Sequence, residues 1–235
     1  MRKKENAFTL IELSIVLIII SLIISGIIGG RALIHSADLR SITSDLNKYK
    51  TSINIFRDQY DALPGDITDA TSYWPVDCVN NGANPCNGDG NGILDSAYES
   101  SRAWQHLYLS SIISKQYEGQ TQSVSVEVLH TNIPSGSLES IFYIYNVVDY
   151  NGRSGNNILI SRPRFFVSYF FPLGGLLKSA DAKIIDKKVD DGKADGGHMR
   201  AMSGRGVTGC LIGGGITGDY NLSTTTNDCI LHSFF

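Results

Sequence analysis

Side chains that carry oxygen recur at alternate positions in the segment from Asn87 to Asp95, and glycines separate most of them. This spacing lets one tight loop point several oxygens inward, as in the first two-thirds of a calcium loop of the EF-hand type. The last position of such a loop needs a bidentate glutamate, but Tyr98 stands there and Glu99 follows one residue later. The calcium ligands predicted from the pattern are Asn87, Asp89, Asn91, Ile93, Asp95 and Glu99. A solvated Asx-Gly turn without metal explains the same residues equally well.

A second chemical feature is Glu12, the one ionisable side chain in the apolar run from Phe8 to Gly30. A carboxylate inside a membrane helix costs about 2.5 to 3.5 kcal/mol, so it usually has a partner. That partner is a lipid headgroup, another chain or a newly made N-terminus, because no lysine or arginine lies at helical spacing on the apolar side. A glutamate that snorkels to the interface without a function is the alternative.

The apolar run itself predicts a membrane-spanning helix. Its 23 residues reach about 34 Å as a helix, and a hydrocarbon core is about 30 Å thick. Arg2, Lys3 and Lys4 precede the run, which places the N-terminus in the cytoplasm and the bulk of the chain outside. The run is longer than a usual signal-peptide core and no A-x-A-like site closes it, although a plain signal anchor stays open as an alternative.

Four cysteines, Cys78, Cys86, Cys210 and Cys229, all lie beyond the apolar run, on the side where oxidation is permitted. Three pairings are possible. We favour Cys78 with Cys86 and Cys210 with Cys229, because each bond closes a local, irregular loop. Reduced thiols in the core are the alternative, and the spacings do not match a zinc site.

Composition and motifs argue against catalysis and nucleic-acid binding. The 235 residues hold 20 Lys and Arg against 23 Asp and Glu, so there is no basic excess for a phosphate backbone. No Walker loop or G-x-S-x-G occurs, and the five histidines have no paired metal spacing. The segment from Gly204 to Gly209 matches G-x-G-x-x-G but precedes no convincing helix. We therefore expect no enzyme.

Hydrophobic periodicity predicts the elements that position these groups. An unbroken helical stripe after the membrane run is formed by Leu39, Ile42, Leu46, Tyr49, Ile53, Phe56 and Tyr60. Pro64-Gly65 ends this helix, and a loop-rich region runs to about Asp95. A second helix is expected around residues 103–113, capped near Ser100 or Ser101. Strands are expected at 123–129, 138–148, 157–161 and 165–171, a short helix at 179–188, and an irregular, glycine-rich C-terminus after it.

The segment Ala7-Phe8-Thr9-Leu10-Ile11-Glu12-Leu13, preceded by Arg2-Lys3-Lys4, closely resembles the leader and start of type IV pilins and type II secretion pseudopilins. The resemblance implies that a prepilin peptidase cuts between Ala7 and Phe8 and methylates the new amine. It implies that Glu12 neutralises the terminal amine of a neighbouring subunit during assembly. Ala7 departs from the family, in which the residue before the cut is nearly always glycine.

The resemblance also implies an α+β, pilin-like fold, in which a long N-terminal helix, half transmembrane and half amphipathic, packs against an antiparallel β-sheet head with irregular, disulfide-closed loops. The expected parts are a leader at 1–7, a transmembrane and assembly helix at 8–30, an amphipathic stalk at 31–62 and a periplasmic head at 63–235. A two-stranded coiled coil is the alternative for the stalk. The loop between Cys210 and Cys229 resembles the C-terminal disulfide loop of type IV pilins.

The function implied is that of a structural subunit, a pseudopilin or minor pilin, of a type IV filament-like assembly, with type II protein secretion as the favoured system. Its expected location is the bacterial inner membrane, in a single pass, and then the filament. The implied partners are itself, other pilin-like subunits, the prepilin peptidase, the inner-membrane assembly platform and membrane lipid. The alternative is a membrane-anchored periplasmic calcium-binding or adhesive module with an uncleaved N-terminal tether.

A second acidic loop, from Asp186 to Gly197, is similar to a stretch in some larger pilin-like proteins. Two interpretations of it stay open. Its carboxylates form local ion pairs with Lys187, Lys188 and Lys193, or they make a second cation site.

Overall fold

The computed structural model describes residues 9–78, 86–119, 131–148, 154–165, 170–214 and 218–235. The chain divides into two units, Met1–Arg40 and Ser41–Phe235. Helix α1 (Leu10–Tyr60) contributes to both units. The predicted strand at 123–129 lies outside the described residues.

In the first unit, α1 exposes its apolar side chains. Leu10, Leu22 and Leu33 are each more than two-thirds exposed, and none of the most apolar window of the helix is buried. Among the described residues, α1 is the one helix that is long and apolar enough to cross a membrane. Such exposure is costly in water and normal in lipid, so the apolar helix suggests membrane anchoring.

In the second unit, the remaining part of α1 buries the predicted stripe. Ile42, Leu46, Ile53 and Phe56 are fully buried. The Tyr49 ring lies 4.9 Å from the Trp104 ring of α3 (Ala97–Leu109) and 5.0 Å from the Phe142 ring of β1 (Ile141–Val148). The stripe therefore packs under the chain's own α3 and sheet, as predicted, and no second helix is needed to cover it.

Helix α3 begins earlier than predicted. Its N-cap is Ser96 and not Ser100 or Ser101, which both lie buried inside the helix. The Ser96 hydroxyl accepts from the Glu99 N–H at 3.1 Å, and Glu99 Oε2 accepts from the Ser96 N–H at 3.2 Å. This reciprocal capping box satisfies two N–H groups of the first turn, which is why the helix starts there.

The sheet is antiparallel, with strand order β1-β2-β5-β4, and β3 also pairs with β2. Its other strands are β2 (Ser154–Phe165), β3 (Phe170–Gly174), β4 (Met199–Ser203) and β5 (Cys229–Phe234). The prediction of an irregular C-terminus was wrong, because β4 and β5 both lie in this region and every residue of β5 is buried. The two predicted strands at 157–161 and 165–171 also have different bounds as β2 and β3.

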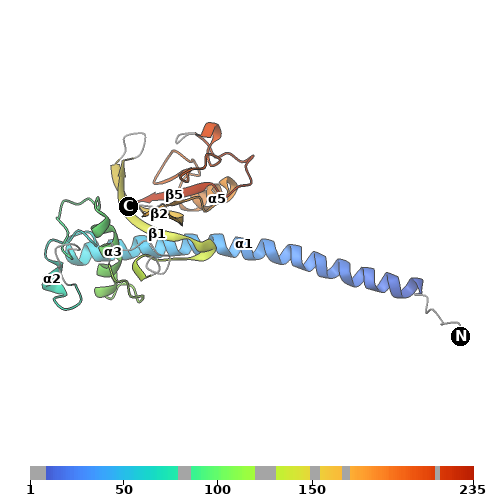
Figure 1. The fold of residues 1–235 in the computed structure, drawn as a ribbon, viewed down its shortest axis with the longest axis horizontal. Helices are drawn as coiled ribbons and strands as arrows, with labels where there is room; N and C mark the ends of the chain where they lie inside the picture. The colour runs from blue at the N-terminus through green and yellow to red at the C-terminus, as the bar shows by residue number, and fades with distance from the viewer. Residues whose placement is uncertain (1–8, 79–85, 120–130, 149–153, 166–169, 215–217) are drawn as a thin grey trace. The chain divides into compact units, whose positions relative to one another are not determined.

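Smaller elements complete the head. Helix α5 (Ser179–Val189) lies against β4 and β5 (Figure 1). Disulfides join Cys78 to Cys86 and Cys210 to Cys229, the two favoured pairings. The remaining elements are the short helix α2 (Ala70–Tyr73) and the 3-10 turns η1 (Ser137–Glu139) and η2 (Ile212–Gly214).

Candidate functional site

At the start of α1, the Glu12 carboxylate is held by its own helix. Oε2 accepts from the Thr9 N–H and from the Thr9 hydroxyl, both at 2.8 Å. In return, the Glu12 N–H donates to Thr9 Oγ1 at 3.3 Å. This is a capping box, and among the described residues it supplies every hydrogen bond to the carboxylate. Ala7 and Phe8, the predicted processing residues, lie outside the described structure.

This arrangement leaves Glu12 available to a second partner. Its hydrogen bonds from described residues all reach Oε2, so Oε1 remains open to an incoming donor. Glu12 is also exposed along the helix surface and forms no ion pair with a described residue. A cationic group from outside the chain can therefore approach the carboxylate without first breaking the cap.

The structure gives two of the six predicted calcium ligands hydrogen-bond partners of their own and brings two others together. Asn87 Oδ1 accepts from the Thr71 N–H at 3.0 Å, and Asn91 Oδ1 accepts from the Ile93 N–H at 2.6 Å. The first bond therefore ties the loop to the start of α2 (Ala70–Tyr73), and the second closes a local turn. Asp95 is exposed and its N–H donates to Glu99 Oε2 at 3.2 Å. Of the six residues, the structure brings together the carboxylates of Asp89 and Glu99.

A third carboxylate, Asp66, joins these two and was not predicted. A carboxylate oxygen from each of Asp66, Asp89 and Glu99 lies within 4.8 Å of the others. Asp66 is buried, and its two oxygens accept from the Gly90 and Gly92 N–H groups, both at 2.8 Å. Burial raises the pKa of Asp66 and of Glu99, and the charge of Asp89 raises both further. Oxygen ligands of this kind suit calcium.

Next to this cluster, a buried histidine contacts the first disulfide. His106 Nδ1 accepts from the Gly65 N–H at 2.9 Å, and Nε2 lies 3.6 Å from the sulfurs of Cys78 and Cys86. Since Nδ1 is the acceptor, the proton of the neutral ring is on Nε2 and faces the sulfurs. Burial lowers the pKa of His106 to about 3. The three side chains are close enough for a metal, but a protonated nitrogen and bonded sulfurs are not ligands.

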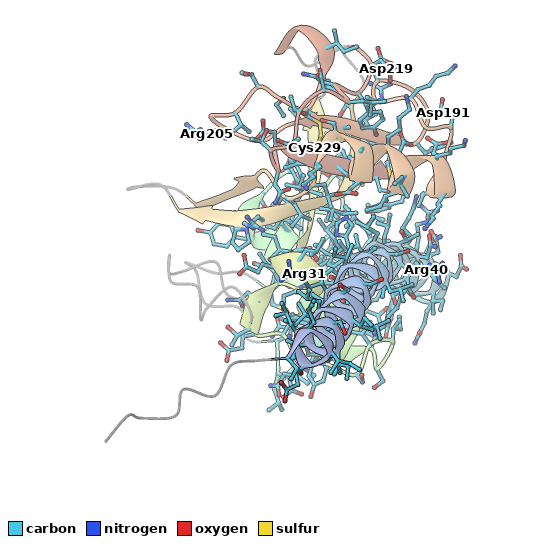
Figure 2. All side chains as sticks on the ribbon, turned by 90° about the vertical axis from the view of Figure 1, so that its right-hand side faces the viewer. Arg31, Arg40, Asp191, Arg205, Asp219 and Cys229 are labelled. Carbon is cyan, nitrogen blue, oxygen red and sulfur yellow. A yellow bond between two sulfur atoms is a disulfide. The ribbon has the colours of Figure 1, made fainter. Side chains whose placement is uncertain are left out.

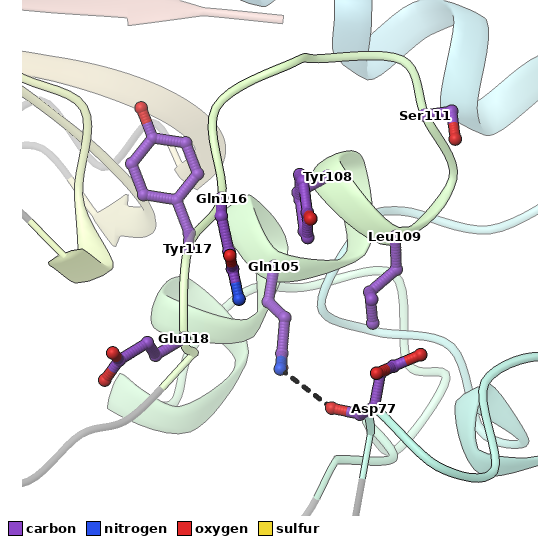
Figure 3. Close-up of a pocket in the computed structure, with 8 residues that line it drawn as sticks. All are labelled: Asp77, Gln105, Tyr108, Leu109, Ser111, Gln116, Tyr117 and Glu118. Carbon is purple, nitrogen blue, oxygen red and sulfur yellow. Dashed lines mark hydrogen bonds between the residues drawn. The ribbon is translucent and has the colours of Figure 1, made fainter.

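A cavity of about 470 Å³ opens beside α3 (Figure 3). Its lining is mostly polar and includes Gln105 and Tyr108 of α3, with Asp77, Tyr117 and Glu118 from the flanking loops. The Gln105 side chain donates to the Asp77 backbone oxygen at 3.2 Å. Nothing in this lining pairs a nucleophile with a base, so we assign it no chemistry.

Comparisons with known proteins agree with the N-terminal site. Residues 2–28 match the family model for the prokaryotic N-terminal methylation motif. Comparisons with curated proteins and with solved structures return no match for the chain. The motif is the signature of type IV pilins and pseudopilins. The long apolar helix, the antiparallel sheet and the two disulfides give the chain an α+β layout that is consistent with a pilin-like fold.

Proposed function

We propose that this chain is a structural subunit, a pseudopilin or minor pilin, of a type IV filament-like assembly that serves type II protein secretion. The observation that carries the proposal is the methylation motif at residues 2–28, which places Glu12 at the start of an exposed apolar helix. Before assembly, α1 anchors the chain in the inner membrane in a single pass, with the N-terminus cytoplasmic and the head periplasmic. We assign the chain no catalytic role.

Processing creates the partner that Glu12 needs. A prepilin peptidase removes residues 1–7 and methylates the amine of Phe8. In the filament, the ammonium of one subunit then meets the Glu12 carboxylate of its neighbour. Each charge alone carries a large desolvation cost in an apolar environment, and the pair carries much less. The pairing therefore fixes the register between subunits.

Leaving the membrane has a cost that neighbouring subunits must offset. The exposed apolar face of α1 loses its lipid contacts as the subunit is extracted. Helices of adjacent subunits replace those contacts by close packing. The energy for extraction comes from an assembly ATPase acting through the inner-membrane platform, and the chain supplies the packing surface.

Intact-mass analysis of the protein from its native membrane tests the processing. The expected mass corresponds to loss of residues 1–7 and gain of one methyl group.

Ala7→Gly restores the family's residue before the cut and should speed cleavage in a pulse-chase experiment. A mature protein that retains its leader would favour the alternative function, a periplasmic calcium-binding or adhesive module on an uncleaved tether.

We also propose that a calcium ion binds in the head at Asp66, Asp89 and Glu99. The support is that their carboxylate oxygens lie within 4.8 Å of one another and that Asp66 and Glu99 are both buried. Asp66 is held by two glycine N–H groups of the loop, so an ion here would tie that loop to the start of α3. The three residues replace the linear set of six as the ligands that the geometry favours.

Removal of calcium should lower the melting temperature of the purified protein by several degrees, because an ion that binds the native state stabilises it by mass action. Asp89→Asn should remove the part of the chelator effect that comes from this cluster and so make the drop in melting temperature clearly smaller. The matched control is Asp95→Asn, which changes an exposed aspartate of the same loop that lies outside the cluster. Loss of the effect in the control instead would favour the linear ligand set, and a wild-type protein indifferent to chelation would end the calcium proposal.

A further inference from the structure

Three other aspartates meet where α5 ends and the chain turns towards β4. Asp186 lies in the last turn of α5, Asp190 is the C-cap and Asp191 follows it. A carboxylate oxygen from each lies within 4.8 Å of the others. Two oxygens that each lie about 2.4 Å from one calcium ion are at most about 4.8 Å apart. The spacing is therefore that of ligands around a single ion.

An independent observation comes from Asp186 itself, which is fully buried. Its Oδ2 accepts from the Tyr220 hydroxyl at 2.8 Å, whereas its buried Oδ1 makes no hydrogen bond of good geometry; the nearby Gly192 N–H interacts only weakly and lowers the pKa of the carboxyl. Buried carboxylate oxygens without a partner are rare, because nothing offsets the loss of water. Burial also raises the pKa of Asp186 to about 6. A cation in the cluster would supply the partner that Oδ1 lacks.

Positively charged side chains do not fill this role. Among the described residues, no lysine or arginine forms an ion pair within 4.0 Å with any of the three aspartates. The local pairing with Lys187, Lys188 and Lys193, one of the two interpretations of this loop, is therefore not seen as direct contact.

The remaining charged neighbours have other partners. Lys50 of α1 donates a hydrogen bond to Ser233 Oγ at 3.2 Å. The negative charge of Asp190 also raises the pKa of Lys50, although the two groups form no direct ion pair. Lys183 pairs with Asp219 at 3.5 Å. Asp219 and Asp191 both act electrostatically on Tyr220, and Figure 2 shows them on the same side of the head. The end of α5 adds the negative end of the helix dipole, so the cluster keeps an excess of negative charge that Lys50 offsets only in part.

The loop after α5 fixes the two outer carboxylates. Asp190 Oδ2 accepts from the N–H groups of His198 and Met199, and Asp191 Oδ1 accepts from the Lys193 N–H at 2.9 Å. Each of these carboxylates keeps one oxygen without a hydrogen bond from the described residues. Gly197 has a φ of 60°, and a Cβ there would collide with the Asp190 carboxylate. The backbone thus wraps closely around carboxylates whose remaining oxygens are free for an ion.

We propose that Asp186, Asp190 and Asp191 bind a divalent cation with the ligand preference of calcium, which ties the end of α5 to the loop entering β4. The donors in the cluster are all oxygens, which suit calcium and not zinc, since zinc sites in proteins are built mainly from sulfur and nitrogen. Backbone carbonyls and water complete the coordination. The site does not depend on the filament function or on the Asp66 cluster.

Terbium luminescence tests this site in the full-length protein in detergent. The protein carries Asp89→Asn, which silences the Asp66 cluster, and is first stripped with a chelator. Tyr220 contacts Asp186, so excitation of tyrosine should sensitise a bound terbium ion, and calcium should displace it. Asp191→Asn should weaken terbium and calcium binding by about tenfold or more, since it removes one of three charged ligands. Asp195→Asn, at an exposed aspartate in the same loop, should leave both affinities unchanged.

Asp191 is exposed, so the Asp191→Asn variant should fold, whereas a change at the fully buried Asp186 would risk the fold. Circular dichroism of each variant verifies that point. Equilibrium dialysis with calcium should give one ion per chain in the Asp89→Asn protein. No bound calcium in that protein, or equal affinities of the Asp191→Asn and Asp195→Asn variants, would overturn the proposal.

Discussion

Glu12→Ala should leave the precursor inserted and cleaved but abolish its incorporation into filaments. The neighbour's ammonium would then be buried without a counter-charge, and removal of one partner of a buried ion pair costs about 3 to 5 kcal/mol. Since each 1.4 kcal/mol is about a tenfold change in an equilibrium constant, subunit addition should weaken by at least about a hundredfold. The measurement compares sheared filaments with the membrane fraction by immunoblot, alongside the intact mass of the membrane-bound subunit.

Two further variants separate charge from hydrogen bonding at this position. Glu12→Gln keeps an oxygen that accepts from the Thr9 N–H and hydroxyl but removes the charge. It should fail to assemble, as the alanine variant does. Ser21→Ala is the control, because Ser21 is polar but donates only to the Leu17 backbone oxygen of its own helix, at 2.7 Å. Normal filaments from Glu12→Gln would show that Glu12 acts as a helix cap and not as a counter-charge.

The parts of the fold that the sequence predicted are those set by local periodicity and local closure. The stripe from Ile42 to Phe56 repeats at helical spacing because one face of this part of α1 is buried. Each disulfide closes a short loop, so the nearest-neighbour pairing was the correct one. Glu12 stands out for a related reason, since a lone charge in an apolar run is visible without any tertiary information.

The missed strands depend on long-range pairing. β5 reads Cys-Ile-Leu-His-Ser-Phe and shows no alternation, because both of its faces are buried and it lies between β2 and β4. His232 fits inside this strand because its Nδ1 lies 3.2 Å from Asn157 Oδ1 of β2. No window of sequence contains that partner, which lies 75 residues away.

The candidate calcium site was missed in part for the same reason. Asp66 lies before the loop in sequence and joins Asp89 only through the fold. Glu99 illustrates a second cause, because the sequence around it fits two roles, that of a calcium ligand and that of a helix-capping residue. The spacing from Ser96 to Glu99 is that of a capping box, and the structure uses it as one. The pattern of calcium ligands predicts only a metal-binding role for Glu99, and the capping role is not visible in it.

Gly65→Ala should strongly destabilise the head, because Gly65 combines a left-handed backbone with a close approach to α3. Gly65 has a φ of +92°, and a Cβ there would lie 2.2 Å from the Glu99 backbone oxygen and 3.0 Å from the Ala103 backbone nitrogen. Both atoms belong to the backbone of α3, so no flexible side chain can move aside. We expect a loss of more than about 3 kcal/mol from strain and displaced packing together. In a domain of this size that loss lowers the melting temperature by about 6 to 12 °C.

Gly92→Ala is the matched control, because Gly92 has a φ of +78° but a Cβ there would meet nothing within 4 Å. Both glycines use their N–H groups, towards His106 and Asp66 respectively, and alanine keeps both donors. The control should therefore lose only the cost of a left-handed alanine, about 1 kcal/mol, or about 2 to 4 °C. Thermal unfolding in the presence of a chelator removes any cation contribution. Equal losses in the two variants would mean that backbone conformation, and not the approach of α3 to Gly65, sets the requirement for glycine at this turn.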